Sequence, residues 1–140
     1  MSKQKSINME LYSLPFKVRD YECDLQGIVN NANYQHYLEH ARHEYIKTMG
    51  LDFSELHAQG VDFVVARIEM AFKTPLKSGD EFTVTVSIKK EGIRWVFLQD
   101  ILRFPDQKLV VRGKVDAVAI VNGKLSHYKP FDDTFCQKGE

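Results

Sequence analysis

The feature that most constrains the fold of this chain is a change in the spacing of its apolar residues at Gly60. Beyond this point, apolar residues recur at every second position, which is typical of β-strands with one buried face. The predicted strands cover residues 64–72, 82–89, 95–104 and 109–121. Short turns rich in Pro, Gly, Asn and Asp separate them, so consecutive strands must run antiparallel.

Before Gly60 the apolar spacing is that of a helix. Apolar residues recur at steps of three or four across residues 31–49, and Gly50 is suited to end this helix. Asp52 is placed to cap a short second helix that runs through His57. The sequence therefore predicts one long amphipathic helix and one short helix ahead of the four strands.

A further strand is predicted over Leu14 to Tyr21, after a loosely attached start from Met1 to Tyr12. The tail from Lys129 is polar and carries no clear signal. Because the apolar face of the long helix needs a sheet to cover it, the simplest arrangement is an α+β fold. We expect a five-stranded antiparallel sheet wrapped around a long central helix, in a single domain spanning residues 1–140.

Composition excludes several classes of function. Among the 140 residues, 19 are Lys or Arg and 19 are Asp or Glu, so the formal net charge is zero and a dedicated nucleic-acid binder is disfavoured. Two cysteines, Cys23 and Cys136, do not make a disulfide framework in a chain of this length. No apolar run is long enough for a membrane span, and the first ten residues lack a signal core. We expect a cytoplasmic protein.

The segment from Asp24 to Tyr34 carries the clearest chemical signal. Asp24 lies in a turn that contains Gly27, and the Asn-rich start of the long helix follows, with Asn30 as the predicted N-cap. Backbone N–H groups at a helix start are unpaired donors that can hold an oxyanion, and a nearby carboxylate can attack or activate water. That combination suits acyl transfer, although an Asp before a Gly is also a common turn residue.

Other candidate residues have simpler interpretations. His36, His40 and His43 follow one helix face, but a solvated or interface stripe explains them better than a metal, and we expect no metal and no cofactor. Cys23 is interpreted as a packing residue with an ordinary pKa, because no base is tied to it. A basic cluster, comprising Lys89, Lys90 and Arg94, is either a solvated turn or a phosphate contact.

The segment Val18–Tyr34 resembles the signature of hotdog-fold acyl-CoA thioesterases of the 4-hydroxybenzoyl-CoA thioesterase type. Ala41-Arg42 on the helix and Pro75 followed by Gly79-Asp80 fit the same pattern, and the similarity runs from about Leu14 to Val121. The resemblance implies a hotdog fold and a homodimer with active sites at the subunit interface, and the sequence leaves a tetramer of such subunits open as an alternative.

The resemblance also implies roles for individual residues. Asp24 matches the catalytic carboxylate, and Asn31 matches the residue whose backbone N–H polarises the thioester carbonyl. Arg94 falls near positions that hold CoA phosphates, and Lys90 of the same basic cluster is a second candidate for a phosphate contact. Gly27 and Tyr34 are assigned with these two basic residues to substrate binding, Tyr34 as part of an acyl pocket.

The predicted function is hydrolysis of an acyl-CoA thioester to a free acid and CoA. An acyl carrier protein (ACP) thioesterase remains an alternative, because the segment Val29–Tyr34 resembles the plant-type enzymes, although Gln26 and Ile28 replace their Asn and His. A hotdog hydratase or dehydratase and a non-catalytic acyl-CoA binding module are further alternatives. A hydratase usually pairs a His with an acid, and no His lies in the Asp24 turn.

Overall fold

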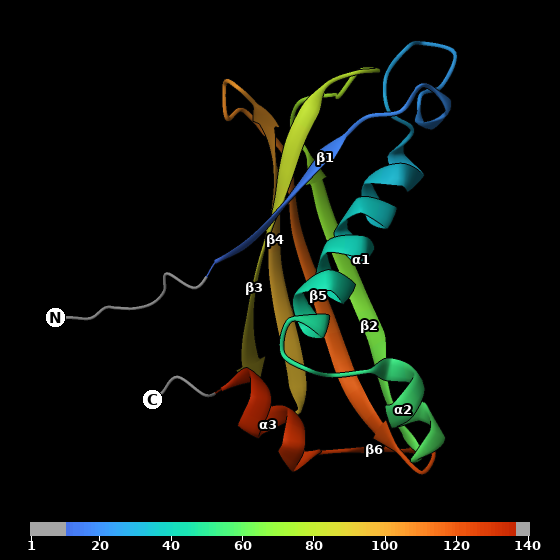
Figure 1. Cartoon of the computed structure of the whole chain (residues 1–140), viewed down its shortest axis with the longest axis vertical. Coiled ribbons are helices and arrows are strands. Elements are labelled where there is room, and N and C mark those ends of the chain that lie inside the picture. The colour runs from blue at the N-terminus through green and yellow to red at the C-terminus, as the bar shows by residue number, and fades with distance from the viewer. Residues whose placement is uncertain (1–10, 137–140) are drawn as a thin grey trace, which may run out of the picture.

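The computed structural model describes residues 11–136 (Figure 1). Its strands are β1 (Tyr12–Lys17), β2 (Val61–Phe72), β3 (Glu81–Glu91), β4 (Arg94–Phe104), β5 (Leu109–Val121) and β6 (Lys124–Ser126). Its helices are the 3-10 turn η2 (Asp20–Glu22), α1 (Asn31–Lys47), α2 (Phe53–Ala58) and α3 (Lys129–Phe135). Apart from Leu11 and Tyr12, the predicted loose start lies outside the described residues.

The sheet confirms the predicted antiparallel architecture. Five strands follow the order β1-β3-β4-β5-β2, and every neighbouring pair is antiparallel. The short strand β6 adds to β5 through the turn at Asn122-Gly123, where the sequence predicts a hairpin. A bulge interrupts the pairing of β2 with β5 between Val65 and Arg67. Since β2 pairs only with β5, its second edge has no partner strand within the described chain.

Helix α1 lies along one face of the curved sheet (Figure 1). It begins where Asn30 accepts a hydrogen bond from the Ala32 N–H at 2.9 Å, as expected for an N-cap. Its buried apolar residues, spaced by three or four, are Tyr34, Tyr37, Leu38, Ala41 and Ile46. A Cβ atom at Gly113 of β5 would lie 2.9 Å from Cδ1 of Leu38, so the helix approaches the sheet closely at this glycine.

Near the start of the chain one prediction is wrong, and near its end the structure contains a helix for which the sequence carried no clear signal. The first strand ends at Lys17 rather than Tyr21, because Asp20–Glu22 forms the 3-10 turn η2. Within the tail, residues Lys129–Phe135 form α3, which buries Phe131 and Phe135 among aromatic rings that include Phe63 and Trp95. The short helix capped by Asp52 is confirmed as α2.

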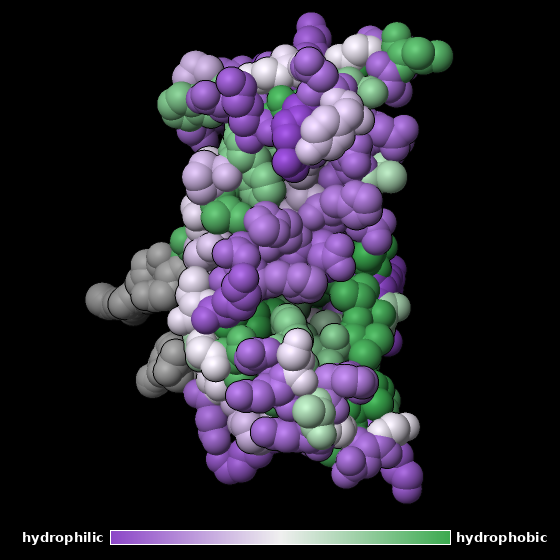
Figure 2. Space-filling view, turned by 45° about the vertical axis from the view of Figure 1, so that its right-hand side comes forward, coloured by the Kyte–Doolittle hydropathy of each residue, from purple (hydrophilic) through white to green (hydrophobic). Residues whose placement is uncertain are grey.

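Strand β2, whose second edge is free, exposes apolar side chains on either side of an exposed Arg67–Glu69 ion pair. Val64, Val65 and Phe72 expose 45%, 41% and 49% of their surfaces. Figure 2 shows hydrophobic side chains gathered along the right-hand flank of the molecule, on the side where β2 lies. An unpaired and apolar strand edge is a surface on which another strand can add. Among the described helices, none is long and apolar enough to cross a membrane.

Candidate active site

The Asp24 turn is a closed loop held by backbone hydrogen bonds. The Asp24 N–H donates to the Ile28 carbonyl at 2.9 Å, and the Gly27 N–H donates to the Asp24 carbonyl at 3.0 Å. Gly27 has a φ of 80°, a left-handed conformation that suits glycine. The Asp24 carboxylate accepts a bond from the Gln26 N–H at 2.9 Å, and its side chain is exposed. The turn therefore fixes the carboxylate while leaving it open to a reactant.

Glu22 ties this turn to the start of α1. Its carbonyl accepts bonds from the Asn30 N–H at 3.0 Å and from the Asn33 side chain at 2.8 Å. Its buried carboxylate accepts a bond from the Tyr37 hydroxyl at 2.8 Å. Burial, together with this bond, raises the pKa of Tyr37 well above its ordinary value. Glu22 is thus a structural acid, whereas Asp24 is an accessible one.

The start of α1 offers an unused donor to a ligand. The Asn30 side chain binds the Ala32 N–H, but among the described residues no acceptor is recorded for the Asn31 N–H. Asn31 lines a cavity of about 280 Å³ between α1 and the end of β2. An unpaired N–H at the positive end of a helix dipole can stabilise an oxyanion.

Tyr34 forms a wall of the same cavity. Its hydroxyl accepts a hydrogen bond from the Leu76 N–H at 3.0 Å, and its ring lies 5.7 Å from the ring of Phe72. Burial raises the pKa of Tyr34, which keeps its hydroxyl protonated. Tyr34 is placed to contact a substrate rather than to transfer a proton.

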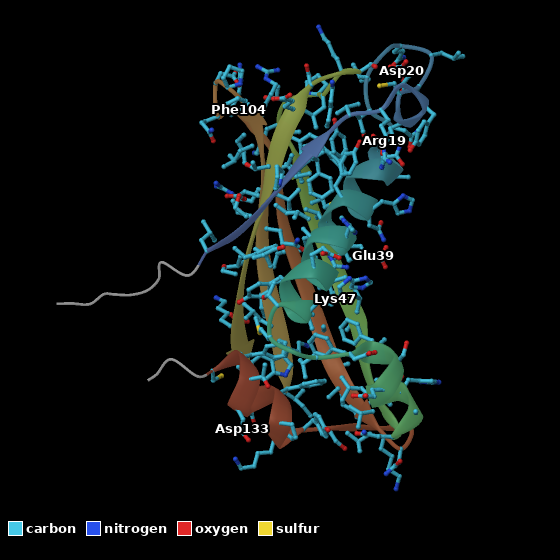
Figure 3. All side chains as sticks on the ribbon, in the orientation of Figure 1. Arg19, Asp20, Glu39, Lys47, Phe104 and Asp133 are labelled. Atoms are coloured by element: carbon cyan, nitrogen blue, oxygen red, sulfur yellow. The ribbon has the colours of Figure 1, made fainter. Side chains whose placement is uncertain are left out.

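The two predicted phosphate contacts lie at the other end of the sheet. Lys90 forms an ion pair with Asp132 of α3, and Arg94 forms one with Asp116 at 3.0 Å. Helix α3 lies at the end of the molecule opposite the loop that leads into α1 (Figure 1). Figure 3 shows the same separation between Asp20, beside the start of α1, and Asp133 on α3. A single chain therefore does not bring these basic residues to the Asp24 turn.

Lys73 and Arg42 both border cavities, although sequence analysis assigned neither of them to a site. Lys73 lines the Asn31 cavity and is exposed, with no ion pair recorded among the described residues. Arg42 is 5% exposed and borders a second cavity farther along α1. A sequence signal existed for Arg42, since it lies four residues from both Leu38 and Ile46 on the apolar face.

The remaining candidates have no visible catalytic arrangement. Burial raises the pKa of the Cys23 thiol, assisted by the nearby carboxylates of Asp20 and Asp24, so the expectation of an ordinary pKa is wrong and the thiolate is disfavoured. The His43 ring packs 5.5 Å from the ring of Phe53. Within residues 11–136, no group of three or more His, Cys, Asp or Glu side chains could hold a metal ion.

Residues 18–138 match the thioesterase-like superfamily, and the chain belongs to this family. A solved structure of Slr0204, a 1,4-dihydroxy-2-naphthoyl-CoA thioesterase from Synechocystis, superposes with a TM-score of 0.85 at 16% identity. The superposition covers 91% of this chain and 97% of that chain, and it confirms the hotdog fold.

Two relatives show how the sequence compares within this family. The chain is 36% identical over 114 residues to the acyl-acyl carrier protein thioesterase ATL3 of Arabidopsis thaliana, covering 81% of this chain. The match spans only 60% of the length of that relative. The chain is also 30% identical over 105 residues to the long-chain acyl-CoA thioesterase FadM of Escherichia coli, covering 74% of this chain and 79% of FadM.

Proposed function

We propose that this protein is an acyl-CoA thioesterase, which hydrolyses a thioester to a free acid and CoA. The observation that carries the proposal is the Asn31 N–H, for which no acceptor is found among residues 11–136. Asn31 lines a cavity at the start of α1 and follows a turn with an exposed carboxylate, Asp24. A thioester carbonyl needs both a nucleophile and charge stabilisation on its oxygen. Membership of the thioesterase-like superfamily supports the same conclusion.

The reaction follows from these two groups. The thioester oxygen accepts a hydrogen bond from the Asn31 N–H, which stabilises the negative charge that develops there. Asp24 either attacks the carbonyl carbon, forming an anhydride that water then opens, or takes a proton from an attacking water. In both routes the C–S bond breaks, water supplies the new oxygen of the acid, and the thiolate leaves and gains a proton. No cofactor takes part in this scheme.

The active unit in this proposal is a homodimer joined at the β2 edges. A two-fold axis through antiparallel β2 strands places the α3 end of one subunit beside the Asp24 turn of the other. That arrangement would bring Lys90 and Arg94 of one subunit towards a carrier bound by its partner. The outer face of the sheet, where Leu98 is exposed, remains available for pairing two dimers into a tetramer.

The carrier is the point on which the relatives differ. FadM is named as an acyl-CoA thioesterase, which supports CoA, while ATL3 is named as an acyl-acyl carrier protein thioesterase, which supports an acyl-ACP substrate as the second candidate. CoA presents its own phosphates to basic side chains, whereas ACP presents a protein surface. We place the protein in the cytoplasm, where both carriers occur with acyl groups attached. We assign residues 1–140 to one domain.

The test is an assay of thiol release from matched acyl-CoA and acyl-ACP substrates that carry the same acyl chains. We expect release by the unmodified protein with acyl-CoA favoured, and loss of release in Asp24→Asn, which keeps the size of the side chain but removes its basicity. Binding of acyl-CoA without any thiol release would contradict the proposal and would indicate a binding module. Faster thiol release from acyl-ACP than from acyl-CoA would indicate that the natural carrier is ACP.

A further inference from the structure

A second cavity, of about 490 Å³, lies between the C-terminal half of α1 and the first half of β2. Its walls include the phenyl rings of Phe53, Phe63 and Phe97. The centroid of the Phe63 ring lies 6.4 Å from that of Phe53 and 6.0 Å from that of Phe97. Such walls suit an apolar ligand. The cavity is not purely apolar, because Arg42 lies in its lining.

Arg42 is unusual because its charge is buried without a carboxylate partner. Its side chain is 5% exposed, and no ion pair is recorded for it among the described residues. Its single recorded hydrogen bond within residues 11–136 is donated to the Gln99 side-chain oxygen at 3.1 Å. A guanidinium has five N–H donors, so most of its donor capacity remains unused. Burial lowers the pKa of Arg42.

The surroundings hold the guanidinium in place rather than neutralise it. Gln99 is itself fixed, since its side-chain N–H donates to the Leu38 carbonyl at 2.9 Å. Glu39, which Figure 3 labels midway along α1, borders the cavity without forming an ion pair with Arg42. The carboxylate of Asp62 is paired with His57 at 2.6 Å. Burying a charge with unused donors is costly, which favours a ligand as the missing acceptor.

The charges around the cavity also indicate which kind of acceptor fits. A carboxylate would pair with Arg42 but would be repelled by Glu39, which lines the same cavity. A neutral oxygen avoids that repulsion, and a hydroxyl could both accept from the guanidinium and donate to a carboxylate. The aromatic walls would enclose the apolar part of the same ligand.

We propose that this cavity receives the far end of the acyl group and that Arg42 recognises a neutral oxygen there, a hydroxyl or keto group. The inference rests on the proposed function, because it assigns the second cavity to the same substrate. Both cavities open between α1 and β2. Eleven helical residues separate Asn31 from Arg42, about 16 Å at the rise of an α-helix. The preferred substrates are therefore medium-length acyl thioesters that carry oxygen near the end remote from the sulfur.

The experiment compares kcat/KM for ω-hydroxyacyl-CoA and unsubstituted acyl-CoA of equal chain length. In the unmodified protein we expect the hydroxylated substrate to be preferred by about 10- to 100-fold, the effect of one hydrogen bond to a charged group. Arg42→Met should abolish or reverse this preference. Arg42→Lys, which keeps the charge, should retain part of it. Glu39→Gln, which removes the neighbouring carboxylate but leaves Arg42 in place, should keep a preference for the hydroxylated chain.

A second measurement does not depend on the variants. Calorimetry on the unmodified protein should show tighter binding of a free ω-hydroxy acid than of the unsubstituted acid. Equal affinities, or equal kcat/KM for the two thioesters, would overturn the proposal. An unchanged preference in Arg42→Met would also overturn it, and loss of the dimer in that variant would then indicate that Arg42 pairs with the second copy. Absence of all hydrolysis in the unmodified protein would instead reject the proposed function itself.

Discussion

Two acids that lie two residues apart, Glu22 and Asp24, have opposite environments. The Glu22 carboxylate is buried and accepts a bond from the Tyr37 hydroxyl, whereas the Asp24 carboxylate is exposed and accepts a bond from the Gln26 N–H of its own turn. Asp24→Asn should lower kcat by at least about 10²–10⁴-fold, the effect of losing a positioned general base, with the melting temperature nearly unchanged. Steady-state kinetics and thermal unfolding of the same sample measure both quantities.

Glu22→Gln is the matched control for that variant. It weakens a buried hydrogen bond to a carboxylate, so it should lower stability by about 1–3 kcal/mol and affect kcat much less. An active Asp24→Asn enzyme beside an inactive, well-folded Glu22→Gln enzyme would show that the wrong carboxylate has been assigned to the chemistry.

Arg94 provides a separate test of carrier binding. If it contacts a phosphate of CoA, Arg94→Ala should raise KM for acyl-CoA by about 10- to 100-fold, the effect of one charge-assisted bond, with little change in kcat. A thioester of N-acetylcysteamine lacks phosphates, so its KM should not change. An equal rise in KM for both substrates would indicate that Arg94 has a structural role, through its ion pair with Asp116.

Individual residues show where sequence analysis succeeded at this scale and where it failed. The helix cap at Asn30 was predictable because capping is local. The ion pair of Lys90 with Asp132 was not predictable, because the two residues are 42 positions apart in the sequence and only the fold brings them together. Arg42 left a visible signal, a charge on an apolar helix face, but its burial and bonding to Gln99 depend on packing against β4.

Among the elements, α3 depends on two buried rings. Phe131 and Phe135, one helical turn apart, pack against Phe63, and Phe135 also packs against Trp95. Phe131→Ala should lower the free energy of unfolding by about 3–5 kcal/mol, because it leaves a cavity in the core. Asp133→Ala, an exposed substitution on the same helix, is the control and should change it by less than about 0.5 kcal/mol. Urea denaturation measures both, and equal small effects would show that α3 contributes little.

Element boundaries followed from periodicity where an element has one buried face. The strand predicted over residues 109–121 agrees with β5, and the helix predicted over residues 31–49 agrees with α1 apart from its last two residues. Helix α3 was missed because it is only seven residues long and four of them are polar or charged, which conceals the spacing of Phe131 and Phe135. The 3-10 turn η2 was missed because its three residues carry no period.

At the scale of the whole molecule, the proposed dimer is joined at the β2 edge, which exposes Val64 and Val65. Val64→Lys and Val65→Lys place charges on an apolar strand edge, and each should shift the dimer towards monomer. Sedimentation velocity at micromolar concentration measures the shift. The control must be a substitution at an exposed position, because a charge at a half-buried position such as Thr83 of β3 would destabilise the fold. Lys124→Glu, on the exposed hairpin, meets this condition. Dimers that persist in both edge variants would place the interface elsewhere.

The central claim is that Asp24 and the start of α1 form a thioesterase site that a second subunit completes. The most direct measurement is specific activity and dimer fraction on the same samples through a dilution series, for the unmodified protein and for Val65→Lys. The account predicts that activity and dimer fraction fall together, and that folded Val65→Lys monomer releases little thiol although Asp24 and Asn31 are intact. A monomer as active per subunit as the dimer would contradict it.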